Sequence, residues 1–191
     1  LTYSPSGTSV LSASSTSGLT ITYSSATESV ATVAGNTLSI VGAGSTVITA
    51  SQAGDSNYNP ATSVTQTQVI NKANQTITFN ALSDLTYSPS GTSNLTASSS
   101  SGLTITYSST NQSVATINNN ILTIVGAGST VITASQAGNE NYNPASSVTQ
   151  TQVINKSNQT ITFNALTNRN YSGAGYSFVV TATSNSGLTV S

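Results

Sequence analysis

The chain of 191 residues contains no Cys, His, Met or Trp, and charged residues make up only 4% of it. Without Cys it has no disulfide, no thiolate nucleophile and no zinc–sulfur site. Without His it has no imidazole base and lacks the commonest transition-metal ligand. Because these absences remove most catalytic chemistries, we expect neither an enzyme nor a protein that binds a cofactor.

The low charge also excludes two classes of partner. Three basic residues against four acidic ones give a net charge of −1. So few cations cannot neutralise the phosphates of a nucleic acid or hold an anionic membrane surface. No apolar run approaches the roughly 20 residues that a membrane-spanning helix needs. We therefore expect no nucleic-acid partner and no membrane insertion in this segment.

Ser and Thr are abundant, with 69 residues between them, and 36% of the chain is apolar. Disordered chains usually combine low hydrophobicity with a high net charge, and this chain has almost no charge. Thr and Val favour strands, whereas dense Ser and Thr disfavour helices. The composition therefore predicts a folded all-β protein rather than a disordered tract.

An internal repeat of 84 residues sets the expected architecture. Residues 1–82 and 85–166 align without gaps and differ at 15 positions. A third copy begins near Asn158 and diverges after Leu166. A unit of this length suits a small β-sandwich domain, whereas solenoid repeats run about 20–50 residues. We therefore predict tandem sandwich domains arranged as beads on a string.

Lys72 and its repeat partner Lys156 mark the expected domain boundaries, because a strand-like run ends before each and a new alternation follows. The predicted domains are residues 1–72, which lack their first strand, 73–156, which are complete, and 157–191, which hold the opening strands of a third. We therefore expect the 191 residues to be part of a longer polypeptide. In an alternative division, the domains start at Leu1 and Leu85. That division would leave a strand-like segment isolated at the C-terminal end of a domain.

The complete domain holds seven strand candidates, at residues 76–79, 94–97, 103–107, 113–117, 121–125, 131–134 and 147–154. Their spacing of about 8–13 residues is typical of a sandwich. Residues 103–107 alternate most regularly, with two threonines facing outward. Residues 118–120 tolerate the positive φ of a tight hairpin. The last candidate changes phase between Val148 and Val153, which indicates a bulge.

Several motifs carry a family resemblance. Residues 22–25 (TYSS), followed by 29–33 (SVATV) and 40–50 (IVGAGSTVITA), resemble the central motifs of bacterial immunoglobulin-like repeats. Residues 51–61 (SQAGDSNYNPA) narrow this resemblance to the variety called MBG repeats. The resemblance implies immunoglobulin-like β-sandwiches of about seven strands, in tandem within giant exported bacterial surface adhesins. It implies no catalytic residues.

The carboxylates do not repeat in a pattern that a metal site would need. The complete domain has only Asp84 and Glu140, which lie far apart in the sequence, and Asp55 of the first copy becomes Asn139 in the second. Calcium usually takes six to eight oxygen ligands, including several carboxylates. We therefore expect no repeated metal site.

Tyrosines are the remaining candidates for a binding site, because exposed aromatic rings can stack on sugars. Tyr3, Tyr87 and Tyr171 are the candidate ligand contacts. Tyr107 alternates with apolar residues, so we expect it in or beside the core. We expect Tyr142 to pack beneath its own loop with its hydroxyl bonded to the backbone.

Together, composition and resemblance predict a structural spacer or stalk of a large bacterial cell-surface adhesin or extracellular filament. Its expected partners are neighbouring repeats of the same chain, with other copies in a filament or surface glycans as further partners. The alternative is a glycan- or surface-binding module that uses exposed Tyr and Ser/Thr faces. A domain without its first strand can also take one from a neighbour.

Overall fold

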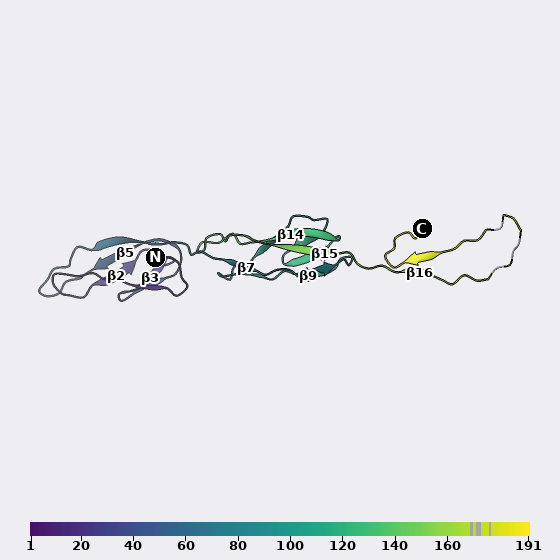
Figure 1. Cartoon of the computed structure of the whole chain (residues 1–191). Helices are drawn as coiled ribbons and strands as arrows, with labels where there is room; N and C mark the ends of the chain where they lie inside the picture. Colours follow the sequence, from purple (N-terminus) through teal and green to yellow (C-terminus); the bar gives the residue numbers. More distant parts are fainter. Residues whose placement is uncertain (169, 171–172, 176) are drawn as a thin grey trace.

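The computed structural model describes residues 1–168, 170, 173–175 and 177–191. These residues form 17 strands and no helix, so the all-β prediction is confirmed. No helix in this part of the chain is long and apolar enough to span a bilayer. The strands fall into three groups that follow one another along a line (Figure 1).

We call these groups the N-terminal body, the middle body and the C-terminal hairpin. The N-terminal body contains β1 (Thr8–Val10), β2 (Thr22–Ser25), β3 (Ala31–Ala34), β4 (Thr37–Ile40), β5 (Gly44–Ser51) and β6 (Val64–Ile70). The middle body contains β7 (Ile77–Phe79), β8 (Leu85–Thr86), β9 (Thr92–Asn94), β10 (Ala97–Ser99), β11 (Thr106–Ser109), β12 (Ala115–Asn118), β13 (Ile121–Ile124), β14 (Gly128–Ser135) and β15 (Val148–Asn155). The hairpin contains β16 (Ile161–Phe163) and β17 (Ala182–Ser184). The boundaries predicted at Lys72 and Lys156 fall in the two connections between groups.

The middle body is a sandwich with immunoglobulin-like strand order. One sheet has the order β11-β14-β15-β8, and the other is built from β12-β13-β9 and β10-β7. Taking β9 and β10 as one interrupted strand gives the four-stranded and three-stranded sheets of an immunoglobulin domain, with β8 added in parallel beside β15. Leu122 from one sheet and Ile132 and Ile154 from the other form the centre of the core. The predicted immunoglobulin-like sandwich is therefore confirmed.

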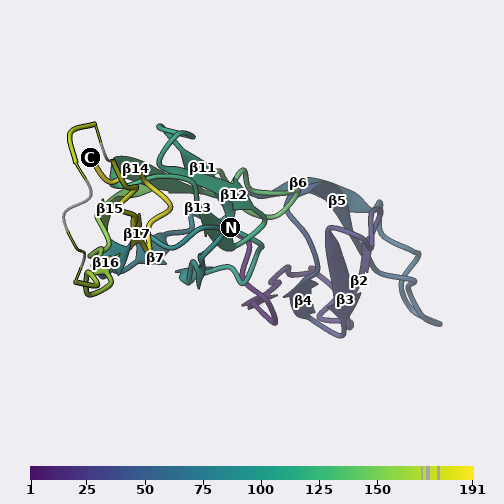
Figure 2. The same cartoon turned by 90° about the vertical axis from the view of Figure 1, so that its right-hand side faces the viewer.

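The N-terminal body repeats this arrangement with fewer strands. Its sheets have the orders β1-β4-β3 and β2-β5-β6, and Figure 2 shows β3 and β4 across from β5 and β6. Leu38, Ile48 and Ile70 form its core at the positions of the three central residues of the middle body. No strand of this body corresponds to β7 or β10 among the residues that the structure describes.

Two local predictions are confirmed, although the strand expected at residues 103–107 is β11, which begins at Thr106. Residues 103–107 alternate between partly buried and exposed, with both threonines outward. The predicted hairpin turns use positive φ, at 58° for Gly35 between β3 and β4 and at 55° for Asn119 between β12 and β13. Gly and Asn adopt this conformation at low cost, which explains why they alternate at one position of the repeat.

Two strand predictions are wrong. Residues 94–97 do not form one strand, because the chain passes from β9 to β10 at Leu95, whose side chain is 2% exposed in the core. Nor does the last strand contain a bulge, since β14 and β15 pair without interruption from Gly128–Ile154 to Ala134–Val148.

Polar residues on the inner face of β15 explain why the sequence pattern predicted a bulge. The inner face of β15 carries Gln150 and Gln152 between apolar residues, and Gln152 is only 2% exposed. A pattern of apolar residues alone therefore appears to change phase where the strand is regular.

Candidate functional site: the joint between the bodies

The loop between β14 and β15 forms the contact between the two bodies. We call residues 139–143 the joint loop. Its conformation is internally fixed, because Asn139 Oδ1 accepts hydrogen bonds from the backbone N–H groups of Asn141 at 2.8 Å and Tyr142 at 2.9 Å. Gly138 precedes it at φ +77°, and a Cβ there would lie 2.3 Å from the carbonyl oxygen of Tyr142. The turn therefore requires glycine.

The joint loop first holds the segment that connects the two bodies. The backbone N–H of Ala73 donates to the Asn141 carbonyl at 2.9 Å, and the N–H of Asn143 donates to the Ala73 carbonyl at 2.8 Å. Gln75 Nε2 adds a hydrogen bond to the Asn143 carbonyl at 2.7 Å. The connection is thus paired like a short strand rather than left as a free linker.

The same loop also reaches the end of the N-terminal body. Asn141 Oδ1 accepts a hydrogen bond from the backbone N–H of Ala43 at 2.8 Å. The rings of Tyr3 and Tyr142 meet edge to face, with centroids 5.3 Å apart and planes at 86°, a favoured aromatic geometry. Both contacts join residues of different bodies, so they limit how the bodies tilt and rotate.

One charged group takes part in the joint. Lys72 Nζ donates to the carbonyl oxygen of Asn139 at 2.7 Å, at an exposed position. The other contacts are between neutral groups, so salt screens little of the joint's stability.

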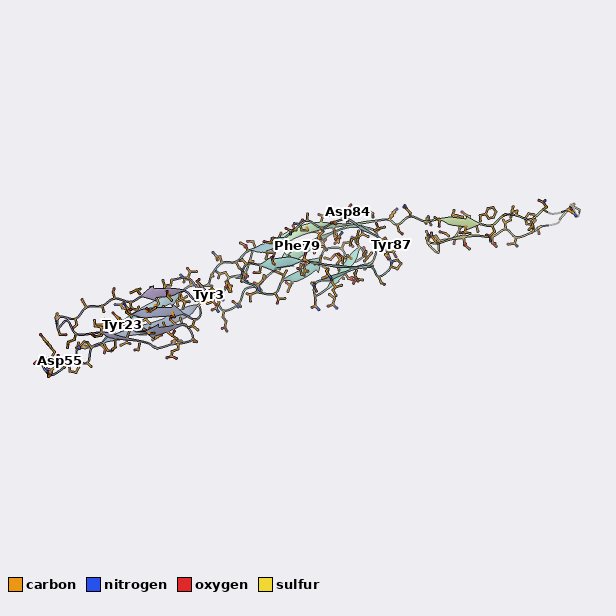
Figure 3. The ribbon with its side chains drawn as sticks, turned by 90° about the horizontal axis from the view of Figure 1, so that it is seen from below. Tyr3, Tyr23, Asp55, Phe79, Asp84 and Tyr87 are labelled. Carbon is orange, nitrogen blue, oxygen red and sulfur yellow. The ribbon has the colours of Figure 1, made fainter. Side chains whose placement is uncertain are left out.

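The corresponding loop of the N-terminal body, residues 55–59, lies at the outer tip of that body, where Figure 3 labels Asp55. Asp55 Oδ1 accepts hydrogen bonds from the N–H groups of Asn57 at 2.8 Å and Tyr58 at 2.9 Å. The Oδ1 atoms of Asp55 and Asn139 therefore accept equivalent backbone hydrogen bonds in the two loops. This explains why the two residue types replace each other between copies of the repeat. Among the described residues, no three acidic groups come close enough together to hold a metal ion.

The structure separates the candidate tyrosines. Tyr3 lies where the two bodies meet, and Tyr87 lies at the corresponding far end of the middle body (Figure 3). Tyr87 is partly buried and packs against the core. Tyr171, the third candidate ligand contact, lies outside the described residues. Tyr3 and Tyr87 thus occupy equivalent ends of successive bodies and do not form one binding face.

The prediction for Tyr107 is confirmed, whereas the prediction that Tyr142 packs beneath its own loop is wrong, because its ring packs against Tyr3. Tyr107 packs against the core, where its ring meets Phe79 edge to face at 5.8 Å and its hydroxyl accepts the Ala97 N–H at 2.7 Å. Tyr142 belongs to a loop as expected, but its ring contacts the preceding body.

Sequence reasoning missed Asn141 and Ala43 as joint residues. A signal was present, since residues 41–54 are identical to residues 125–138 and the motif NYNP recurs at 57–60 and 141–144. Exposed loops usually vary between copies of a repeat. Ala43 and Asn141 lie at such unchanged loop positions, although Asn139 and Glu140 of the same loop replace Asp55 and Ser56.

Comparison with known proteins gives no match to any protein-family model. No curated protein sequence matches the chain either.

The chain is similar to several solved structures. It matches Drosophila N-cadherin EC1-4 with TM-score 0.38 and 14% identity, covering 78% of this chain and 44% of that one. The match to surface layer protein SbsC, domains 1-6, has TM-score 0.33 and 18% identity, over 74% of this chain and 21% of that one. A C-terminal fragment of intimin, in complex with the intimin-binding domain of its translocated receptor, gives TM-score 0.29 and 18% identity, over 75% and 54%.

The chain thus spans about half or less of the length of each of these structures. The TM-scores and identities are low, so the fold assignment depends on the strand order of this chain.

Proposed function

We propose that the chain is an extracellular spacer, a segment of the shaft of a large bacterial surface adhesin or filament. The observation that carries this proposal is the joint, which connects consecutive sandwich bodies through defined contacts instead of a loose linker. A shaft needs its domains held in line, and the hydrogen bond between Asn141 and Ala43 with the ring contact between Tyr3 and Tyr142 supplies that restraint.

The repeat organisation supports the same proposal. The longest strands, β5, β14 and β15, have eight residues each, which gives each body a strand length of roughly 26 Å at a rise of about 3.3 Å per residue. Each added copy of the repeat lengthens the shaft by at least that amount and uses the same domain again. Faces rich in Ser and Thr hydroxyls stay hydrated with little charge, which suits an extended surface outside the cell.

Small-angle scattering of the 191-residue chain in dilute solution tests the proposal. We expect a distance distribution with the long tail of a rod, and a shape unchanged between low and high salt because the joint is nearly uncharged. A compact or broadly averaged particle would contradict the spacer, because it would show that the bodies are not held in line.

The glycan-binding alternative is tested separately by Tyr87→Ala. A spacer predicts that the unaltered chain binds no glycan on an array. A binding module predicts attachment that a folded Tyr87→Ala variant loses; because Tyr87 packs against the core, the variant is compared at a temperature at which its melting curve shows it to be folded.

A further inference from the structure

The first and last segments of the middle body lie side by side from the joint to the far end of the body. Residues 73–87 lead from the joint through β7 to β8, and residues 141–155 lead from the joint loop through β15. The two segments run in the same direction, since an isolated parallel bridge joins them near the joint and Leu85 pairs in parallel with Ile154 at the far end. We call the contacts between these two segments the seam.

A buried glutamine holds the seam at the joint end. Gln75 is 6% exposed, and its Nε2 donates to the Asn143 carbonyl at 2.7 Å and to Gln136 Oε1. Its Oε1 accepts a hydrogen bond from Ser99 Oγ at 2.7 Å. One amide therefore ties the start of the first segment both to the joint loop and to β10.

Two glutamines of β15 hold the middle of the seam. Gln150 Nε2 donates to the Phe79 carbonyl at 2.7 Å, and Gln152 Nε2 donates to the Ser83 carbonyl at 2.9 Å. The Phe79 side chain, 5% exposed, anchors β7 in the core. β7 forms its backbone ladder with β10 rather than with β15. Side-chain amides therefore supply here the bonds that a backbone ladder supplies at β8.

Backbone groups close the seam at the far end. β8 and β15 pair in parallel, and the Tyr87 N–H donates to the Asn155 carbonyl at 2.8 Å. The N-terminal body has the same contact, from the Tyr3 N–H to the Asn71 carbonyl, also at 2.8 Å. The parallel contact is therefore a feature of the repeat and not of one body alone.

Tension along the chain loads the seam in shear. The N-terminal body precedes residue 73 at the joint, and the C-terminal hairpin follows residue 156 at the opposite end of the middle body (Figure 1). Pulling these two neighbours apart draws the first segment toward the joint and the last segment away from it. Because the segments are parallel, they then slide past each other, and the bonds along the seam break together. Peeling the same strands apart would break the bonds one at a time, at a lower force.

We propose that the seam is the force-bearing element of the chain, and that Gln75, Gln150 and Gln152 carry tension between the two connections of the middle body. The body then transmits a pull from one neighbour to the next without unfolding. The inference deepens the proposed spacer and rests on it, because a shaft that links two separated points is stretched by them. It adds resistance to stretching to the straightness that the joint supplies.

Single-molecule pulling of the whole chain in two directions tests the proposal. The chain contains no cysteine, so introduced cysteines give unique attachment points for DNA handles. Lys72→Cys with Lys156→Cys places the handles at exposed positions beyond the two ends of the seam and loads it in shear. Ala127→Cys, also at an exposed position, with Lys156→Cys pulls β15 from β14 at the end where Gly128 pairs with Ile154, so these strands peel apart pair by pair.

The two directions load the same folded body differently. We expect the shear pair to unfold the middle body at a force at least about twice that of the peeling pair at equal pulling speed, because several bonds break together only in shear. Equal melting temperatures of the two cysteine variants would show that this difference comes from direction and not from stability. Equal forces in the two directions overturn the proposal. They leave the spacer intact if scattering still shows a rod.

Gln150→Met tests one of the force-bearing side chains. Methionine keeps the length and the apolar stem but removes the donor to the Phe79 carbonyl. We expect the unfolding rate at constant force to rise about tenfold in shear and less than about twofold in peeling, where the first pairs to break lie elsewhere on β15.

Thr151→Met is the matched control, because Thr151 is exposed on the outward face of the same strand. It should leave both unfolding rates nearly unchanged. If Gln150→Met raises the rates in shear and in peeling equally, the glutamine contributes to stability alone, and its assigned role in carrying tension is wrong.

Discussion

The side-chain oxygen of Asn141 accepts a hydrogen bond at 2.8 Å from the backbone N–H of Ala43, 98 residues earlier in the chain. Beside it, a Cβ on Gly42 would lie 2.7 Å from the Ser29 carbonyl oxygen and 3.4 Å from Asn141 Oδ1. A side chain at Gly42 would therefore strain the end of the N-terminal body and crowd this contact. The joint depends on close approach between one amide side chain and bare backbone.

Asn141→Ala should loosen the joint without unfolding either body. The variant loses a single inter-body hydrogen bond, worth about 0.5–1.5 kcal/mol, and the loop keeps its own bonds to Asn139. We expect a broader distribution of distances between spin labels placed on the two bodies. Asn57→Ala is the matched control, because it alters the equivalent loop at the outer tip. An equal broadening in both variants would contradict the assigned role of Asn141.

Gly138→Ala should disturb the joint loop more than any loss of one hydrogen bond. A Cβ at Gly138 would lie 2.3 Å from the Tyr142 carbonyl, whereas at Gly102, with a similar φ of +74°, it meets nothing within 4 Å. Gly102→Ala carries only the backbone strain, about 1–2 kcal/mol. We expect Gly138→Ala to lower the melting temperature of the middle body further and to lengthen the inter-body distance. Similar melting temperatures for the two variants would show that the loop accommodates the clash.

The sandwich architecture could be predicted from the sequence because it follows from local patterns that repeat. Alternation at residues 103–107 and the turn at Asn119 depend on neighbours along one strand or hairpin. The 84-residue period then indicated tandem units. The domain boundaries at Lys72 and Lys156 stay a prediction.

The joint could not be predicted in the same way, because its partners lie far apart in the sequence. Nothing local to Asn141 indicates Ala43 as its partner. The strand errors have a related cause: Leu95 is buried where the strand is interrupted between β9 and β10, and Gln152 is buried because Ser83 supplies an acceptor. Burial of a polar or isolated residue depends on what tertiary structure places opposite it.

Gln152→Ala should destabilise the middle body by about 2–3 kcal/mol. The side chain is 2% exposed, and its Nε2 donates to the Ser83 carbonyl at 2.9 Å, so the variant loses a buried bond and leaves a cavity. Gln68→Ala is the matched control in the N-terminal body and should change stability by no more than about 0.5 kcal/mol in dilute solution. Hydrogen exchange resolved along the chain measures both bodies in one sample. Equal loss of protection in the two variants would show that the contact to Ser83 contributes little.

Phe79→Ala should have the largest effect, because it removes the anchor that seals the middle body. Phe79 is 5% exposed and meets the ring of Tyr107 at 5.8 Å, and truncating a buried Phe usually costs about 3–5 kcal/mol. The N-terminal body has a core of its own without an equivalent strand, so we expect exchange protection to fall in β7, β10 and β15 while β3 to β6 keep theirs. Phe163→Ala, at 56% exposure, should change neither body in dilute solution. If Phe79→Ala removed protection from both bodies together, they would form one cooperative unit, and the joint would then be part of the folding core instead of a contact between independent bodies.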